Sequence, residues 1–258
     1  MSYPGGKSGA GVYQTIINLM PPHEVYIEPF LGGGAIMRLK RPAALNIGLD
    51  LEARALPPET AMLDPAAKNG DRRSTNAENG EASSRKNARF EFRQADGIAF
   101  LESFKPEGRT LIYCDPPYLM ATRSGKRLYE HEMSEVDHRR LLRALQDLSP
   151  ACLLMISGYS HPLYARELKT WNVASYQTTT RGGKPVAEWL WYNFPRPVEL
   201  HDYRYLGSNY REREKIKRQQ KRWKGRLARM NTLQRQALLF AIAETAAFDD
   251  GASGMQRK

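Results

Sequence analysis

The chain has 258 residues, of which 41% are hydrophobic, and it carries a net charge of +11 at pH 7. A chain of this length can bury a substantial core, which fits one enzyme domain with one appendage. Its two cysteines, Cys114 and Cys152, lie inside apolar runs and form neither a disulfide framework nor a zinc-binding spacing. No apolar run approaches the roughly 20 residues of a membrane span, and the N-terminus lacks the apolar stretch of a signal peptide. We therefore expect a cytoplasmic protein that uses neither a metal nor a membrane, with a monomer slightly favoured over an oligomer.

The positive charge is concentrated near the C-terminus. Residues 204–235 contain twelve Arg and Lys against two Glu, a net charge of +10, which leaves +1 for the rest of the chain. Such a segment suits a polyanion, because each cation near a phosphate releases condensed counterions. The alternative is a solvated helix face, since five apolar residues near helical spacing predict one long helix with a docked apolar stripe. These residues are Ile216, Trp223, Leu227, Met230 and Phe240. The size of the charge imbalance favours contact with nucleic acid.

Two further segments are polar. Between residues 64 and 88 the only apolar side chains are those of Ala and Pro, so this segment is expected to be a disordered insertion. The chain after Phe248 has a similar character. The expected organisation is a catalytic domain at 1–200 that contains the insertion, a basic helical extension at 201–245 and a flexible tail at 246–258.

Between these segments, apolar runs alternate with helical patterns. The runs predict strands at residues 24–28, 43–49, 90–93, 110–114 and 151–157, and the helical patterns lie at 11–20, 34–40, 99–104 and 134–148. Alternating strands and helices imply a largely parallel sheet that is covered on both sides. Two later strands, at 173–180 and 186–194, flank a Gly-rich segment that is typical of a hairpin tip. We expect an α/β fold with a doubly wound, mostly parallel sheet and an antiparallel edge hairpin.

Residues that follow the strands are candidates for a binding site, because ligands of doubly wound sheets lie beyond the carboxyl ends of the strands. The first strand is followed by three glycines, which permit a tight turn and leave N–H groups free to hold an anion. Met37 stands where the dinucleotide fingerprint has its third glycine, which argues against NAD or FAD. Asp50 ends the second strand, where a carboxylate can bind a ribose diol, and Asp96 follows the third, where a helix cap is the commoner role. Together the three strand ends predict a cofactor that contains a nucleoside.

The fourth strand delivers the tetrapeptide Asp115-Pro116-Pro117-Tyr118. Taken alone, this sequence is an ordinary proline turn after a strand. After an apolar strand it also resembles the signature of amino-methyltransferases that act on exocyclic nitrogens.

The pieces around this tetrapeptide resemble, in their order, the Dam-type family of N6-adenine-specific DNA methyltransferases, which includes phage-borne and solitary enzymes. They are the opening Tyr3-Pro4-Gly5-Gly6-Lys7, the glycine loop, Asp50, the tetrapeptide and the segments 156–159 and 188–193, a match over roughly residues 1–195. The resemblance implies a sheet of the S-adenosylmethionine-dependent methyltransferase type, S-adenosyl-L-methionine as cofactor and duplex DNA as substrate.

The tetrapeptide suits this chemistry. Adenine N6 is a poor nucleophile, because its lone pair is delocalised into the ring. Acceptors on its two N–H bonds, the Asp115 carboxylate and the Pro116 carbonyl, would stabilise the positive charge that develops during attack. Pro116 and Pro117 fix the direction of that carbonyl. Tyr118 offers a flat face to a base that has left the helix stack.

The resemblance also assigns residues to the cofactor. It implies that Lys7 reaches toward the cofactor carboxylate, that the glycine loop holds the methionyl part, that Asp50 binds the ribose and that Asp96 faces the adenine amine. Tyr3 stands where the family commonly has Trp. The complete set is Tyr3, Lys7, Glu28, Pro29, Phe30, Gly32, Gly33, Gly34, Asp50, Asp96 and Asp115.

Contacts with DNA are expected in the loop 119–133, at the hairpin tip and on the basic C-terminal helix. The candidates are Arg123, Lys126, Arg127, Tyr129, Arg181, Lys184, Lys217, Arg218, Lys221 and Arg222. His138 has no other histidine at metal-ligand spacing, and we expect it to be a helix cap or a surface contact.

The sequence is compatible with three hypotheses about the function of the chain. The leading hypothesis is a DNA adenine-N6 methyltransferase. The second is a related amino-methyltransferase acting on RNA, protein glutamine or cytosine N4, against which the Dam-like opening and the segment 188–193 argue. The third is a noncatalytic nucleic-acid-binding relative, against which the intact tetrapeptide argues.

Overall fold

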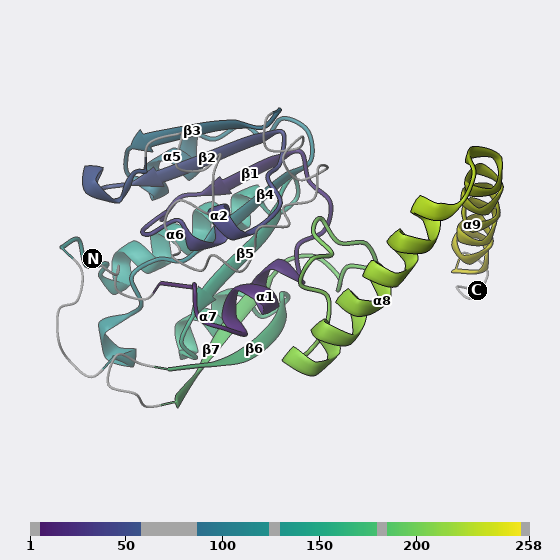
Figure 1. Cartoon of the computed structure of the whole chain (residues 1–258). Coiled ribbons are helices and arrows are strands. Elements are labelled where there is room, and N and C mark those ends of the chain that lie inside the picture. The colour runs from purple at the N-terminus through teal and green to yellow at the C-terminus, as the bar shows by residue number, and fades with distance from the viewer. Residues whose placement is uncertain (1–5, 58–86, 124–129, 180–184, 254–258) are drawn as a thin grey trace. The chain divides into compact units, whose positions relative to one another are not determined.

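The computed structural model describes residues 6–57, 87–123, 130–179 and 185–253 (Figure 1). The chain divides into two compact units, Met1–Leu206 and Gly207–Lys258. Of the insertion expected at 64–88, all but the last two residues lie outside the described residues.

The first unit is built on a seven-stranded sheet in the order β3-β2-β1-β4-β5-β7-β6. The strands are β1 (Val25–Glu28), β2 (Leu45–Asp50), β3 (Arg89–Gln94), β4 (Thr110–Cys114), β5 (Leu153–Gly158), β6 (Asn172–Thr179) and β7 (Pro185–Tyr192). The first five strands pair in parallel, whereas β7 runs antiparallel to both β5 and β6. The expected doubly wound, mostly parallel sheet with an antiparallel edge hairpin is confirmed. The chain progresses outward in opposite directions from β1 and β4, which creates the switch point at which such sheets bind ligands.

Helices cover both faces of this sheet (Figure 1). Helices α1 (Val12–Ile17) and α2 (Ala35–Leu39) contribute to one buried cluster, and α5 (Gly97–Ser103), α6 (Glu135–Leu148) and α7 (Pro162–Glu167) to the other. Short 3-10 turns occur at η1 (Ala53–Ala55) and η3 (Met120–Thr122).

Strand β4 contributes side chains to the buried clusters on both faces of the sheet. Leu111 and Tyr113 join the cluster of α1 and α2, whereas Ile112 and Cys114 join the cluster of α5, α6 and α7. This alternation is the two-residue period of a strand. Because both faces are covered, all five residues are buried, and the four that follow Thr110 form a continuous apolar run.

The expected strand and helix bounds mostly differ from the observed ones by one or two residues, and those of β4 agree. Helix α1 is shorter than the expected 11–20, since the chain leaves the helix at Asn18. Helix α7 was not expected from the sequence, although it has a proline in its first turn and His161 as its N-cap. Proline at that position is a start signal, because it has no N–H group that would need a partner.

The second unit contains α8 (Tyr210–Arg229) and α9 (Thr232–Ser253). The expectation of one long helix is wrong, because Met230 adopts an extended conformation that ends α8. The Asn231 side chain then accepts a hydrogen bond from the backbone N–H of Gln234 at 2.9 Å, as an N-cap does. Helix α9 continues to Ser253, past residue 246, where the sequence indicated a flexible tail.

Gly97 allows α5 to begin close to the end of β1. A Cβ atom at this position would lie 2.2 Å from the carbonyl oxygen of Pro29, which is backbone and cannot turn aside. Alanine at 97 would therefore force α5 away from the loop that follows β1.

We predict that Gly97→Ala lowers the free energy of unfolding by about 1 to 3 kcal/mol, the usual cost of overpacking. Gly225→Ala is the matched control, because a Cβ at this position in α8 meets nothing within 4 Å. In a helix interior that exchange should stabilise by up to about 1 kcal/mol. Urea unfolding followed by circular dichroism measures both, and equal midpoints for the two variants would contradict the close approach at Pro29.

Candidate functional site

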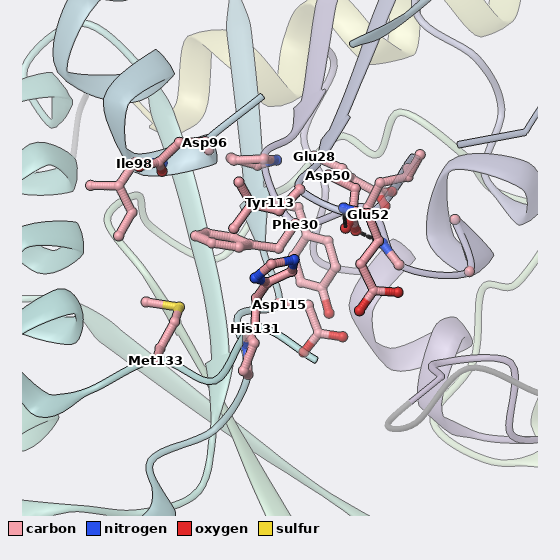
Figure 2. Close-up of a pocket in the computed structure, with 18 of the residues that line it drawn as sticks. Glu28, Phe30, Asp50, Glu52, Asp96, Ile98, Tyr113, Asp115, His131 and Met133 are labelled. Carbon is pink, nitrogen blue, oxygen red and sulfur yellow. Dashed lines mark hydrogen bonds between the residues drawn. The ribbon is translucent and has the colours of Figure 1, made fainter. Parts of the chain in front are cut away.

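A cavity of about 420 Å³ opens beyond the carboxyl ends of the first four parallel strands. Its walls contain most residues that the sequence analysis assigned to a cofactor, as Figure 2 shows for several of them. These are Lys7, Glu28, Pro29, Phe30, Gly32, Gly33, Gly34, Asp50, Asp96 and Asp115. Tyr3 lies outside the described residues. Residues from five separate stretches of sequence thus meet at one place.

The glycine loop connects β1 to α2 by a turn that needs glycine. Gly32 and Gly34 have φ angles of 49° and 59°, in the left-handed region that other residues rarely adopt. Gly34 is the N-cap of α2. The loop is held against the end of β2, because the Leu31 N–H donates to the Leu49 carbonyl at 2.8 Å.

Asp50 fixes this loop from β2. Its Oδ2 accepts a hydrogen bond from the Gly32 N–H at 2.7 Å, and its Oδ1 accepts one from the Glu52 N–H at 2.9 Å. Burial raises the pKa of Asp50 above its ordinary value, while the two backbone N–H groups oppose the shift. A carboxylate offers about four lone-pair sites, so Asp50 retains acceptor capacity toward the cavity.

Asp96 combines two roles that the sequence analysis treated as alternatives. Its Oδ1 caps α5 by accepting hydrogen bonds from the N–H groups of Ile98 and Ala99, at 2.8 and 3.3 Å. It also lines the cavity, and its Oδ2 lies 3.6 Å from a guanidinium nitrogen of Arg140. The capping role is confirmed, and contact with a cofactor adenine stays a prediction.

Asp115, at the end of β4, belongs to a buried polar network. The Lys7 ammonium lies 2.9 Å from Asp115 Oδ1 and 3.3 Å from Glu188 Oε2, and it donates a hydrogen bond to the Tyr118 hydroxyl at 2.8 Å. The Tyr118 hydroxyl lies 3.2 Å from Asp115 Oδ1 and 2.9 Å from Glu188 Oε2. Tyr176 donates to the same Glu188 oxygen at 2.9 Å. Every contact of Asp115 in this network therefore uses Oδ1.

Charge is unevenly balanced in this network, because two carboxylates share one ammonium. Burial by itself lowers the pKa of Lys7, but the effects of Asp115, Tyr176 and Glu188 together outweigh burial and raise the pKa well above the ordinary range. Burial also raises the pKa of Asp115, with Lys7 opposing the shift and Glu188 adding to it. Lys7 is consequently a fixed positive charge that favours the ionised form of Asp115.

The other tetrapeptide residues differ in their access to the cavity. Pro117 lines it, whereas Pro116 and Tyr118 are not among its wall residues. The Tyr118 ring is buried and packs edge-on against Tyr159, with 4.8 Å between ring centroids. Its hydroxyl is thus placed to orient Asp115, and its stacking on a base stays a prediction.

Glu28 is a second buried carboxylate in the cavity wall. Its Oε1 accepts a hydrogen bond from the Tyr26 hydroxyl at 2.7 Å. Burial raises the pKa of Glu28 to about 7, against the opposing effects of Tyr26 and Lys40. Glu28 therefore changes its charge near neutral pH.

His138 is not the cap or surface contact that the sequence analysis expected. It is fully buried, and its Nδ1 lies 2.9 Å from the Tyr164 hydroxyl. The helical spacing of His138 with Leu141, Leu142 and Leu145 already places it on the inner face of α6. Burial lowers the pKa of His138 to about 4, so it is neutral at pH 7.

The candidate DNA contacts divide into three groups. Lys126, Arg127, Tyr129, Arg181 and Lys184 lie outside the described residues. Arg123 is buried in an ion pair with Glu132, both side chains being less than 10% exposed, so its guanidinium is not presented to a ligand at the surface. Lys217, Arg218, Lys221 and Arg222 lie on α8.

Several cavity residues were missed. Glu52, His131, Met133 and Arg140 line the cavity, and Glu188 joins the network from β7. Glu52 stands two residues after Asp50, just past the end of β2. Its position next to a predicted site residue could have indicated that it lines the cavity. The other missed residues lie in a loop (His131 and Met133), in α6 (Arg140) and in the antiparallel strand β7 (Glu188). Tertiary packing brings these elements to the cavity, and local sequence patterns do not show that packing.

Two classes of site are not found among the described residues. No helix there is long and apolar enough to cross a membrane. In the same part of the chain, no three His, Cys, Asp or Glu side chains are grouped as metal ligands would be.

Comparison with known proteins gives distant likenesses of fold. No family model matches the chain, and no curated protein matches it by sequence. A conserved hypothetical protein from Streptococcus pyogenes is 11% identical, with 75% of this chain and 100% of that chain covered and a TM-score of 0.43. An rRNA methylase from Streptococcus thermophilus is 12% identical over 69% and 92% of the two chains, with a TM-score of 0.37. A dimethyladenosine transferase from Plasmodium falciparum is 11% identical over 74% and 63%, with a TM-score of 0.41. With identities of 11% to 12% and TM-scores below 0.5, these are distant likenesses of fold alone.

Neutral, buried His138 makes the fold sensitive to acid. Because the pKa is lower in the folded state than in the unfolded state, the unfolded chain binds the proton first, and stability falls as pH falls from about 6.5 toward 4. We predict that His138 accounts for about 2 kcal/mol of lost unfolding free energy between pH 7 and pH 5.

Urea unfolding of the wild type and of His138→Gln across this range checks the prediction, with exposed His131→Gln as the control. The His138→Gln variant should lose less stability on acidification than either other protein. Parallel curves for all three proteins would contradict a neutral His138 in the folded state.

Proposed function

We propose that this chain is an S-adenosyl-L-methionine-dependent methyltransferase that transfers a methyl group to the N6 amine of adenine in duplex DNA. The observation that carries the proposal is the position of Asp115. It ends β4 with one carboxylate oxygen held by Lys7 and Tyr118, and it opens into the cavity that also contains the glycine loop, Asp50 and Asp96.

The cavity fits a cationic nucleoside cofactor. Among the described residues, its wall carries eight carboxylates and two side chains that are always cationic, Lys7 and Arg140. The carboxylates are Glu28, Asp50, Glu52, Asp96, Asp115, Glu130, Glu132 and Asp137. S-adenosyl-L-methionine supplies a methyl group on a positively charged sulfur, and such a wall attracts positive charge. Its volume lies within the usual range for small-molecule sites.

Separate residues would hold the separate parts of the cofactor. Asp50 and Glu52, at the end of β2, present acceptors for ribose hydroxyls. The N–H groups of the glycine loop at the start of α2 suit a carboxylate, and Glu28 suits an ammonium. Ile98 and Asp96 line the opposite part of the wall, where an adenine ring would find an apolar contact and an acceptor.

Asp115 would act on the target amine. Among the described residues no donor bonds its Oδ2, whereas Oδ1 is bonded by Lys7 and Tyr118. Oδ2 is therefore available to accept an N–H of an amine in the cavity and to stabilise the positive charge that grows on the nitrogen. Because Oδ1 is already fixed, little reorganisation is needed at that moment.

The choice of adenine in DNA rests on the sequence. The resemblance to the Dam-type family covers the opening, the glycine loop, Asp50, the tetrapeptide and the segment 188–193. The basic C-terminal segment adds affinity for a polyanion. The resemblance favours DNA adenine over the related substrates, and the basic segment favours a nucleic acid over a protein substrate.

We predict that Asp115→Ala lowers methyl transfer at least about 100-fold while cofactor affinity changes little, because the lost interaction serves the reacting amine. Asp50→Ala should raise the dissociation constant of the cofactor first, because it removes both the ribose acceptor and the anchor of Gly32.

Transfer of labelled methyl groups to duplex DNA, with RNA of the same sequence as a parallel substrate, measures the reaction. Isothermal titration with S-adenosyl-L-methionine measures binding. An active Asp115→Ala variant would overturn the mechanism, and transfer to RNA alone would replace DNA by RNA in the proposal.

Glu28 should make cofactor binding dependent on pH. The pKa of Glu28 in the free protein is about 7, so below that pH a cationic ligand must displace a proton from it. We predict that affinity for S-adenosyl-L-methionine rises about tenfold between pH 5.5 and pH 7. Glu28→Gln should remove most of this dependence, and an identical pH profile for that variant would exclude Glu28 as the titrating group.

A further inference from the structure

The basic residues of α8 are not spread evenly around the helix. Six of them follow one another at intervals of three or four residues and therefore share one side of the helix. We call them the arginine row: Arg211, Lys215, Arg218, Arg222, Arg226 and Arg229. Lys217, Lys221 and Lys224 recur with similar spacing on another side, and we call them the lysine set. The four DNA candidates on α8 thus divide, since Arg218 and Arg222 belong to the arginine row.

The arginine row lacks close carboxylate partners among the described residues, although Lys215 lies near enough to Glu212 to lower the pKa of that carboxyl. None of its side chains forms an ion pair with a carboxylate of the described residues. Glu212, one of the two acidic residues in α8, is bound to the Ser208 side chain at the helix start. The Arg218 Nε donates to the backbone carbonyl of Glu214, not to its carboxylate.

Repulsion along the arginine row favours an external anion. Like charges three or four residues apart destabilise a helix by about 0.2 to 0.5 kcal/mol per pair. The helix also contains Gly225 in its interior, a further cost of about 1 kcal/mol relative to Ala. A polyanion along the row would relieve the repulsion.

The spacing and chemistry of the arginine row match the phosphates of a duplex. From Arg211 to Arg229 the helix rises about 27 Å, over which one strand of a duplex presents about eight phosphates. Arginine predominates in the row, and its planar guanidinium binds phosphate through two parallel hydrogen bonds. Several row residues border a groove together with half-exposed Trp223, whose ring lies 5.2 Å from the guanidinium of Arg226.

A membrane fits this helix less well. Helices that lie on membranes bury a wide apolar face. The apolar residues of α8 are few, and Ile216 and Leu227 are already partly buried within the protein. Gln219 and Gln220 interrupt the stripe between Ile216 and Trp223.

We propose that the arginine row of α8 is a sequence-independent anchor for the phosphate backbone of duplex DNA, separate from the catalytic cavity. The anchor holds the enzyme on DNA by charge while the base is selected elsewhere. It deepens the proposed function, but binding through the row requires neither the cofactor nor methyl transfer.

The experiment compares two variants of the full chain with equal change in charge. In the row variant, Arg218, Arg222 and Arg226 are replaced by Gln, and in the control variant Lys217, Lys221 and Lys224 are replaced by Gln. Glutamine preserves helix propensity, and circular dichroism verifies that both variants fold. Binding to a 30-base-pair duplex of arbitrary sequence is measured without cofactor at several salt concentrations.

Each lost phosphate contact lowers the slope of log affinity against log salt by about 0.9. The row variant should therefore lose about 2 to 3 from the slope, whereas the control variant should lose less than about 1. Equal losses of slope in the two variants would show diffuse attraction to the whole helix instead of binding by the arginine row. An unchanged slope in both variants would overturn the proposed anchor. Binding to vesicles rich in anionic lipid is measured in parallel. If the wild type bound these vesicles more tightly than DNA, and the row variant did not, α8 would be a membrane-binding helix. Methyl transfer does not enter the readout, so a failed anchor and a failed methyltransferase assignment remain distinguishable.

Discussion

The Lys7 ammonium, buried between the Asp115 and Glu188 carboxylates, is the interaction on which the arrangement of the site depends. It joins the start of the chain, the end of β4 and an antiparallel strand, which are far apart in sequence. Removing a charge from water is costly, and a buried pair is stable only when its geometry and hydrogen bonds are nearly complete. Tyr118 and Tyr176 supply those hydrogen bonds. Without Lys7, the carboxylates of Asp115 and Glu188 would repel each other at the point where chemistry is proposed.

Local sequence patterns accounted well for the elements that are buried on both faces. The bounds of β4 could be predicted because a strand covered on both sides is apolar over most of its length, as β4 is from Leu111 to Cys114. The glycine loop could be placed because positive φ angles favour glycine. Acidic residues at the ends of β2 and β3 reach the cavity for a similar reason, since parallel strands end at one edge.

Tertiary pairing lies beyond such patterns. Arg123 looked like a basic residue of an exposed loop, yet Glu132 holds it in a buried pair. His138 was misjudged as an isolated polar residue, although its spacing with the leucines of α6 indicated the interior. The break between α8 and α9 depends on one Asn side chain, which competes with continuation of an otherwise helical sequence.

The antiparallel strand β7 has a consequence for how this site can change. In a purely parallel sheet, only residues that follow a strand reach the carboxyl edge, so new chemistry there requires new loops. Because β7 runs in the opposite direction, its first half lies at that edge, and Glu188 reaches the network from within a strand, opposite Tyr176 of β6. Glu188 is held in the ladder by its pairing with Tyr176. A single substitution at position 188 can therefore change the charge beside Asp115 without any change in loop length. The electrostatics of the site and the lengths of its loops can thus vary independently of each other.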